Sequence, residues 1–449
     1  MRISPGLWNC CGTLLLTLLP MLLAGSARAE AAQGLHYRVK VRIDPASHRL
    51  EAEAWIRQPP TARFFLNREF SVRQVLADGK PVPFHRDEAG EGLPFVLVAG
   101  PVVAEAENPQ QLYVKYDGEM REVANGVNLI SPDLIELAYY SAWYPLFGMA
   151  DATFEIELDT PAGWLATTNG ELKKQQEQGG RAVTLWASYR PGFDLALFAS
   201  PHLCRIAGEV KGARVEVYGD QSSEEFLRSK ADGLAQAMNR LADLYGAPRV
   251  NSVLRVVYSP RGGWGYSRIP LIVLSGEQAK ESMNTPDGQA EEFQGESHEL
   301  AHFWWNLADA GTPEDWINEG LAEFSAYRLA DERFSKAFAE TLLQRYRDHA
   351  AATRTDSSIA ETEGSSPDRY VNRYEKTALM FVEAQRRFGS EPLDTTLRSL
   401  YAQCARGRQA TTALFLAEVR LRMGAEAEAF FHSILYRKGV ISQPTPAAQ

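Results

Sequence analysis

The N-terminal half of the sequence alternates hydrophobic and polar residues. Between Gly34 and about Leu203 this alternation recurs in short segments, and a period of two residues is typical of strands with one buried face. The segments include "LHYRVKVRI", "LEAEAWI", "FSVRQVL", "QLYVKY", "TFEIEL" and "VTLWAS". Turn-forming pairs punctuate the pattern: Asp78-Gly79, Asn169-Gly170 and Gly179-Gly180. The pattern predicts an all-β domain, built as a twisted sheet or a sandwich.

The hydrophobic spacing becomes helical in the second half. Strand-like runs at 213–219 and 253–259 flank a helical run that begins at Glu224 and is closed by Gly246. Further helices are predicted at 289–309, 313–333, 335–353 and 369–387, with shorter ones toward the end of the chain. We therefore predict the α+β fold class, with an N-terminal β domain over residues 30–205 and a helix-rich domain over residues 206–449.

The first residues carry the pattern of a secretory signal peptide. Arg2 precedes the apolar stretch "LLLTLLPMLLAG", and Ala27 and Ala29 form an A-x-A cleavage pattern. The alternative is a membrane anchor, but a spanning helix needs about 20 unbroken apolar residues. The apolar run is shorter than that and contains Pro20. The sequence therefore predicts a signal peptide over residues 1–29, a secreted or periplasmic chain, and no stable membrane insertion after cleavage.

Composition narrows the class of protein. The 449 residues include 47 Lys and Arg against 57 Asp and Glu, which gives a net charge of -10. This balance offers no basic surface for nucleic acid or for an anionic membrane. Removal of the signal peptide leaves Cys204 and Cys404, too few for a cysteine-rich metal site. The two cysteines either pair in an oxidising compartment or remain buried thiols.

One segment of the helical half carries a metal-binding pattern. In "HELAH", His298 and His302 are four residues apart, so a helix presents both imidazoles on one face. Catalytic zinc accepts imidazole nitrogen and keeps one position for water, which Glu299 can reach as a general base. The alternative is two solvated histidines on a helix surface. The apolar run "FWW" that follows favours burial of this helix, and buried paired histidines need a partner.

A carboxylate partner follows on the next predicted helix. Thr312 suits the N-cap and Pro313 the first turn of the helix that contains "WINEG". Glu319 in this motif is placed to supply a third ligand. Glu323 lies four residues further on the same face, where it can hydrogen-bond a ligand imidazole from behind. The alternative is that both are solvated helix carboxylates. The favoured reading is a His-His-Glu site for one Zn²⁺ ion.

"HELAH" followed by "WINEG" resembles the gluzincin zinc metallopeptidases, the family of aminopeptidase N and leukotriene hydrolase. The family has H-E-x-x-H, a spacer, and N-E-G with the glutamate ligand; the spacer here, residues 303–318, is shorter than usual. "NRYEKTALMFVEAQRRFG" is similar to the family's Y-E-K-G helix, so its oxyanion-stabilising role carries over to Tyr374. "DTPAGWLATTNGEL" is similar to its β domain. The resemblance implies a saddle-like β domain followed by a thermolysin-like catalytic domain.

The region that should recognise the substrate's amino end departs from this family. The family uses G-x-M-E-N on an edge strand, and the corresponding stretch here is "GGWGYSRIPLIVL". After Gly265, Ser267 replaces the methionine and Arg268 replaces the amine-binding glutamate. Glu136, nine residues before Pro145, stands where the family's β domain supplies a second amine-binding group; the alternative is a plain strand residue. The resemblance implies that these four residues border the substrate, and that Arg268 opposes an ammonium.

Together these features predict a secreted zinc-dependent metallopeptidase that is aminopeptidase-like, with altered recognition of the amino end. His298, His302 and Glu319 would hold the metal, with Glu299 as general base and Tyr374 as oxyanion donor. The expected partner is a peptide substrate, not nucleic acid. Two alternatives remain: a hydrolase of non-peptide substrates on the same scaffold, and a non-catalytic zinc-binding protein. The sequence leaves exopeptidase or endopeptidase action and the oligomeric state open.

Overall fold

The alternating segments of the N-terminal half form strands that bury every second side chain. In the computed structural model this pattern is clearest in β1 (His36–Asp44), β2 (Arg49–Arg57) and β8 (Gln111–Glu119). Their inward residues, such as Val39 and Val114, are fully buried. The structure describes residues 34–87, 96, 98–121, 128–188, 190–210, 213–220, 223–248, 253–263, 265–353 and 356–438.

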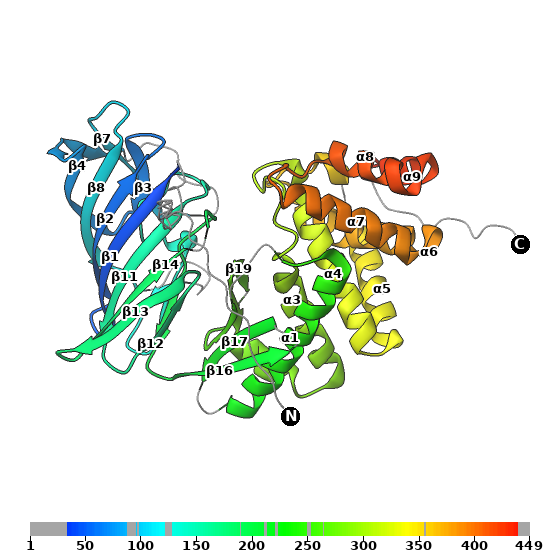
Figure 1. Cartoon of the computed structure of the whole chain (residues 1–449), viewed down its shortest axis with the longest axis horizontal. Helices are drawn as coiled ribbons and strands as arrows, with labels where there is room; N and C mark the ends of the chain where they lie inside the picture. The colour runs from blue at the N-terminus through cyan, green and yellow to red at the C-terminus, as the bar shows by residue number, and fades with distance from the viewer. Residues whose placement is uncertain are drawn as a thin grey trace, which may run out of the picture. The chain divides into compact units, whose positions relative to one another are not determined.

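These strands belong to a mixed sheet with the order β13-β14-β11-β1-β2-β8-β4-β5 (Figure 1). Strand β1 pairs in parallel with β11 and antiparallel with β2. The other strands are β4 (Phe70–Ala77), β5 (Lys80–Pro81), β11 (Thr153–Pro161), β13 (Glu171–Gln178) and β14 (Arg181–Ala187). Two predicted turns are confirmed: Asp78-Gly79 and Gly179-Gly180 have positive φ angles and connect adjacent strands.

Shorter strands complete the N-terminal half. They form sheets with the orders β12-β15-β10-β9 and β3-β7-β6. Their bounds are β3 (Arg63–Asn67), β6 (Phe84–Arg86), β7 (Ala99–Ala104), β9 (Leu129–Ile130), β10 (Ile135–Leu137), β12 (Leu165–Thr168) and β15 (Leu197–Ser200), with a short 3₁₀ turn η1 (Tyr139–Ser141) after β10. Apolar side chains from these sheets, including Phe64 and Ile135, pack into the same core as Val39 of the large sheet.

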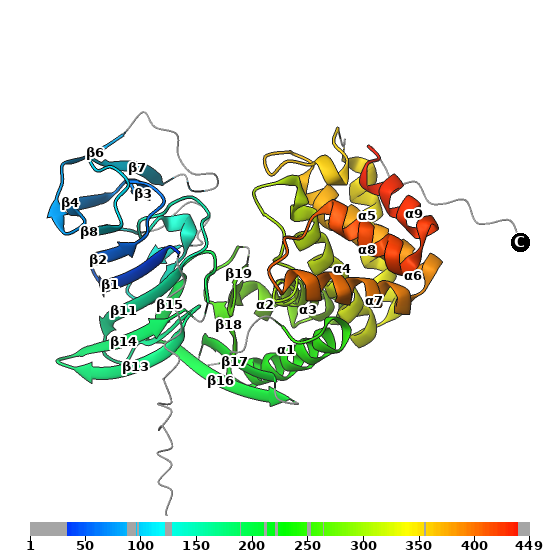
Figure 2. The same ribbon diagram turned by 45° about the horizontal axis from the view of Figure 1, so that its top comes forward.

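The second half begins with a mixed sheet that helices cover. Its order is β16-β17-β18-β20-β19, so β19 is an edge strand (Figure 2). The strands are β16 (Leu203–Val210), β17 (Ala213–Asp220), β18 (Leu254–Ser259), β19 (Tyr266–Arg268) and β20 (Leu271–Ser275). Helix α1 (Glu224–Tyr245) packs against β16 and β17 and ends at Gly246, whose φ of 96° suits glycine.

The described residues after β20 are mainly helical. The helices are α2 (Gly276–Ser282), α3 (Pro286–Ala301), α4 (Trp316–Arg333), α5 (Lys336–Ala352), α6 (Thr377–Phe388), α7 (Ser390–Cys404), α8 (Thr412–Met423) and α9 (Ala425–Leu435). Short turns η3 (Pro313–Asp315) and η4 (Ile359–Glu361) and the π-helix η5 (Val371–Lys376) connect them. Trp304, Trp305 and Trp316 are fully buried in the core that these helices share with the second sheet.

The fold class predicted from the sequence is therefore confirmed: a β-sheet domain precedes a helix-rich domain. Sheet membership changes between Ser200, the end of β15, and Leu203, the start of β16. The boundary near residue 205 remains a prediction. Residues 1–29, predicted as a signal peptide, lie outside the described residues. Among the described helices, none combines the length and apolarity that crossing a membrane requires.

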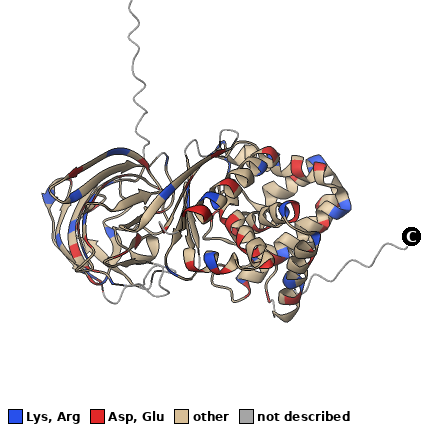
Figure 3. Ribbon diagram, turned by 90° about the horizontal axis from the view of Figure 1, so that it is seen from below, with Lys and Arg blue, Asp and Glu red and all other residues tan. Residues whose placement is uncertain are grey.

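Cys204 and Cys404 are not joined by a disulfide. Of the two alternatives left open by the sequence, the disulfide is therefore absent; Cys404 is buried as expected, but Cys204 is only half-buried. Acidic and basic residues are interspersed along the described ribbon (Figure 3).

The helix predicted over 289–309 is shorter than expected. It spans Pro286–Ala301, because the amides of Phe303 and Trp304 bond to carbonyls three residues back and close the last turn. The side-chain oxygen of Asn318 then accepts from the amides of Leu307 and Ala308, at 2.8 and 3.0 Å, which holds the following segment away from the helix axis.

Candidate metal centre and the adjoining cavity

Helices α3 and α4 bring two imidazoles and a carboxylate to one point. The Nε2 atoms of His298 and His302 lie 3.3 and 3.4 Å from the same oxygen, Oε2 of Glu319. One ligand atom from each residue lies within 4.8 Å of the other two. His302 follows the last residue of α3 but keeps a helical conformation, so the four-residue spacing still places both rings on one face. Two imidazoles and one carboxylate are a donor set that suits zinc.

The Nδ1 atoms of both histidine rings, on the side away from Glu319, have hydrogen-bond partners. His298 Nδ1 lies 2.6 Å from Oε2 of Glu323, and His302 Nδ1 lies 3.0 Å from the carbonyl oxygen of Trp305. Glu323 also accepts hydrogen bonds from the Tyr346 hydroxyl and from Gln294, the latter at 2.8 Å. These contacts fix the ring orientations with both Nε2 atoms toward Glu319, as metal-ligating histidines require.

The charges of the group stabilise one another. Burial alone would raise the pKa of Glu319, but His302 and His298 outweigh burial and hold this pKa well below its usual range. Burial alone would lower the pKa of His298, but hydrogen bonds to Glu319 and Glu323 raise it well above its ordinary value. The group therefore favours a positive charge between the carboxylates of Glu319 and Glu323. A divalent metal ion would supply such a charge.

The asparagine and glycine of "WINEG" explain the local structure around Glu319. The Asn318 amide donates to Oδ1 of Asp315 at 2.9 Å and to the Ala308 carbonyl at 3.1 Å, which ties the start of α4 to the loop after α3. A Cβ on Gly320 would lie 2.1 Å from Cγ2 of Thr377. Glycine therefore allows α4 to approach the segment that carries Tyr374.

Tyr374 lies beside the candidate ligands on a π-helix, η5. Its ring stacks on the His298 ring, with centroids 5.5 Å apart and an interplanar angle of 6°. Burial and then the Glu319 charge raise the pKa of Tyr374 well above its ordinary value, so the phenol keeps its proton near neutral pH. Local π-helices often mark functional sites. The prediction of an ordinary helix from residue 369 is wrong for this turn.

Arg373, next to Tyr374, was not singled out in the sequence. Its guanidinium is buried and donates to Asp315 at 2.6 Å and to the Thr362 carbonyl at 2.7 Å. Burial raises the pKa of Asp315 to about 6, with a further contribution from Glu319. The pair joins the start of α4 to the π-helix, so it sets the position of Tyr374 relative to Glu319.

Glu299 lies next to His298 on α3 and is half-buried. Its carboxylate is not engaged in a hydrogen bond or ion pair with any described residue. Its negative charge contributes to raising the pKa of His298 and of His302. A carboxylate that is close to the group but not committed to a partner is available to accept a proton.

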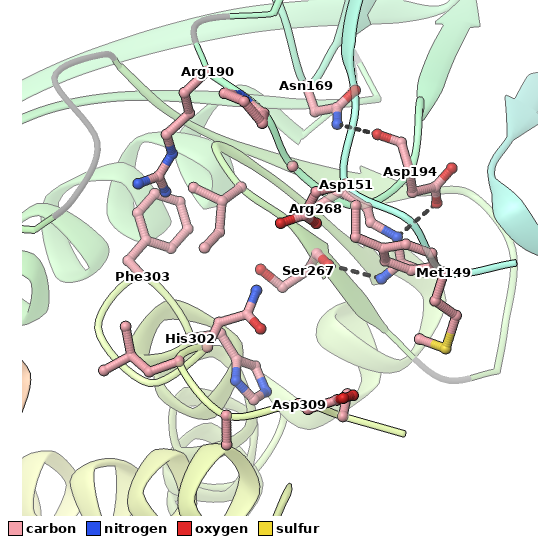
Figure 4. A pocket seen from close by; sticks show the side chains of 18 of the residues that line it. Met149, Asp151, Asn169, Arg190, Asp194, Ser267, Arg268, His302, Phe303 and Asp309 are labelled. Atoms are coloured by element: carbon pink, nitrogen blue, oxygen red, sulfur yellow. Dashed lines mark hydrogen bonds and ion pairs between the residues drawn. The ribbon is translucent and has the colours of Figure 1, made fainter. Parts of the chain in front are cut away.

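A cavity of about 650 Å³ adjoins His302. Ser267 and Arg268 line it together with His302, as Figure 4 shows. Glu136 and Gly265 are not among its lining residues. Glu136 is fully buried and paired with Arg261, and a Cβ on Gly265 would lie 2.7 Å from Leu274, so that glycine serves packing between strands.

The structure changes the interpretation of Arg268. The sequence placed it as a cation that opposes a substrate ammonium, but its Nε lies 2.6 Å from Oδ2 of Asp194, and the Asp194 side chain is fully buried. The two residues are 74 positions apart, and no local pattern in the sequence indicates this pair.

This chain is similar to known proteins in its structure. No protein-family model matches the sequence, and no curated protein is similar to it in sequence. A crystal structure of an M1 zinc metallopeptidase mutant from Deinococcus radiodurans, bound to a Tyr-Ser-Ala substrate, matches with a TM-score of 0.70 and 17% identity. The match covers 92% of this chain and 97% of that chain.

Two related crystal structures agree with this match. A mutant of a two-domain M1 zinc metallopeptidase bound to L-tryptophan has a TM-score of 0.68 at 17% identity, over 92% of this chain and 97% of that chain. An M1 zinc metallopeptidase from Deinococcus radiodurans has a TM-score of 0.67 at 17% identity, over 92% and 95%. The chain therefore has the two-domain fold of the M1 zinc metallopeptidases, and it carries a candidate metal-binding group, His298, His302 and Glu319, of the H-E-x-x-H and glutamate kind.

Proposed function

We propose that this chain is a secreted zinc-dependent metallopeptidase. The observation that carries the proposal is the convergence of both Nε2 atoms on Glu319 while both Nδ1 atoms are held by other groups. This donor set fits zinc in number, type and orientation. When bound there, zinc would supply a Lewis acid for a substrate carbonyl and for water.

Two residues beside this group would move protons and stabilise charge. The Glu299 carboxylate accepts the proton of the attacking water and then passes it to the nitrogen of the leaving amine. The Tyr374 hydroxyl donates a hydrogen bond to the oxyanion that develops on the substrate carbonyl. The raised pKa of Tyr374 supports this role, because only the protonated phenol can donate.

Digestion of an unlabelled peptide mixture tests the function. We expect the zinc-loaded chain to cut peptide bonds, the chelator-treated chain to be inactive, and added zinc to restore cleavage; mass spectrometry of the products is the measurement. Tight zinc binding without cleavage of any peptide would contradict the proposal. It would favour a non-catalytic zinc protein or a hydrolase of other substrates on this scaffold.

Secretion rests on the N-terminal sequence pattern alone. N-terminal sequencing of the exported chain is expected to begin at Glu30. Retention of residues 1–29 on a membrane-bound chain would favour the anchor alternative.

The Glu323→Gln variant is expected to bind zinc at least about tenfold more weakly than the wild type. Glutamine keeps the shape of the side chain but removes the charge that orients His298 through its Nδ1 atom. Zinc competition against a chelator of known affinity measures the change. The matched control is Glu332→Gln on the same helix, since Glu332 is exposed and pairs with Arg240 on the surface. An equal effect of both substitutions would show that Glu323 has no specific role in orienting the ligand.

A further inference from the structure

The cavity beside His302 contains a buried ion pair on its wall. Arg268 Nε lies 2.6 Å from Oδ2 of Asp194, and the two side chains are only 10% and 0% exposed. Both oxygens of Asp194 have further partners: its Oδ2 accepts from the Tyr139 amide at 2.9 Å and its Oδ1 from the Tyr144 hydroxyl at 3.3 Å. This carboxylate is thus fully committed within the protein. Figure 4 shows its contact with Arg268 as a dashed line.

Aromatic rings hold the guanidinium of Arg268 in place. The carbon Cζ lies 5.2 Å from the centroid of Tyr140, 5.0 Å from that of Phe193 and 5.2 Å from that of Tyr266. Its Nη1 donates to the Ser267 carbonyl at 2.8 Å. A planar cation with an ion pair, a hydrogen bond and three ring faces is a fixed part of the wall.

The carboxylate of Glu136 is also buried, and it too is held by partners within the protein. Arg261 donates to both oxygens of Glu136, with the shortest contact at 2.7 Å, and the Ser259 hydroxyl donates at 2.9 Å. Glu136 is fully buried and does not line the cavity. Neither buried carboxylate is therefore available to a substrate ammonium, which needs an anion or several oriented acceptors to replace its water.

The described acidic and basic residues that line the cavity are equal in number. Among its described lining residues, three aspartates accompany three arginines: Asp151, Asp194, Asp309, Arg190, Arg268 and Arg408. Asp151 and Asp309 belong to exposed residues, where water screens their charge. None of the described lining residues therefore offers a buried, uncompensated negative charge that would select an amino terminus.

We propose that the cavity receives peptides without a free amino end, namely N-acylated peptides or internal segments of longer chains, so that the enzyme acts as an endopeptidase. The proposal rests on the peptidase function proposed above. An uncharged amide needs only hydrogen bonds when it leaves water. The edge strand β19 and the polar residues of the cavity wall can provide these hydrogen bonds, and no substrate charge has to be neutralised. An ammonium in the same place would lose hydration without gaining a buried carboxylate as a partner among the described lining residues.

Matched peptides test the proposal. Two internally quenched peptides of identical sequence, one with a free amino end and one N-acetylated, have the scissile bond adjacent to the amino-terminal residue. We expect the zinc-loaded chain to cleave the acetylated peptide with a kcat/KM at least about tenfold higher than that of the free-amine peptide. The reason is that the free-amine peptide must dehydrate its ammonium without making a charge-assisted contact in return. Titration calorimetry of both peptides on the Glu299→Gln variant is expected to show the same order of affinity.

The outcomes separate this proposal from the function on which it rests. Cleavage of the free-amine peptide alone would overturn the endopeptidase assignment and leave the peptidase function standing. Cleavage of neither peptide, nor of any in a broader mixture, would overturn both.

A pair of variants tests the role of the ion pair itself. Arg268→Gln leaves the Asp194 carboxylate uncompensated on the cavity wall. We therefore expect the ratio of kcat/KM for the acetylated peptide to kcat/KM for the free-amine peptide to fall by about tenfold. Arg268→Lys keeps a cation and is expected to keep the wild-type preference. A folded Arg268→Gln variant with an unchanged preference would overturn the assignment of this pair. If that variant does not fold, the comparison of the two peptides on the wild-type chain remains decisive.

Discussion

The Glu299→Gln variant is expected to lose peptide hydrolysis by about 10²–10⁴-fold while it keeps its zinc. Glutamine has nearly the same shape as glutamate but cannot accept the proton of the attacking water. Glu299 has no described hydrogen-bond partner, so the substitution should leave the fold and the metal ligands undisturbed. Steady-state kcat/KM on a quenched peptide, together with zinc content by atomic absorption, measures both quantities.

The control for this variant lies on the same helix. Glu291 is exposed and pairs with Arg345 at 2.9 Å, so Glu291→Gln removes an equal charge from α3 away from the candidate ligands. It should retain wild-type activity. Wild-type activity in Glu299→Gln would mean that another group accepts the proton.

The Tyr374→Phe variant is expected to reduce kcat by about 10²–10³-fold, with little change in KM. Phenylalanine keeps the ring that stacks on His298 and removes only the hydroxyl that we propose as the donor to the oxyanion. An effect on kcat alone is the signature of an interaction that forms in the transition state. The measurement is a kcat and KM comparison on one peptide, with zinc affinity as a check that His298 is undisturbed.

Tyr370 provides the matched control. Its ring stacks on Tyr374 with centroids 4.8 Å apart, and the residue is 54% exposed. Tyr370→Phe removes a hydroxyl from the neighbouring ring and is expected to change kcat less than about twofold. Equal losses in the two variants would assign the effect to packing of the π-helix, and an unaffected Tyr374→Phe would remove Tyr374 from the chemistry.

The local parts of this molecule could be predicted from its sequence. Strands β1, β2 and β8 alternate in burial as their hydrophobic pattern indicates, and α1 begins and ends where predicted. The candidate metal group was predictable because His298 and His302 are four residues apart at the end of one helix, and Glu319 lies in a recognisable motif on the next helix. In each case the signal spans a few residues and the geometry follows from the helix or strand repeat.

The features missed depend on contacts between distant residues. Strand β13 has the sequence "ELKKQQEQ", which has one apolar residue and therefore no alternation; it exists because it pairs with β14 at the edge of the sheet. Likewise Glu136 and Arg261 are 125 positions apart. The sequence marked "GYSRI" as a departure from the family pattern but could not reveal that Arg268 pairs with Asp194, so that Arg268 is not a free cation on the cavity wall.

A zinc-edge anomalous difference map from a crystal of the zinc-loaded chain tests the central claim most directly. We expect one strong peak about 2.0–2.1 Å from Nε2 of His298 and of His302, and about 2.0–2.2 Å from a carboxylate oxygen of Glu319. A peak held by other residues, or no peak at a saturating zinc concentration, would contradict it.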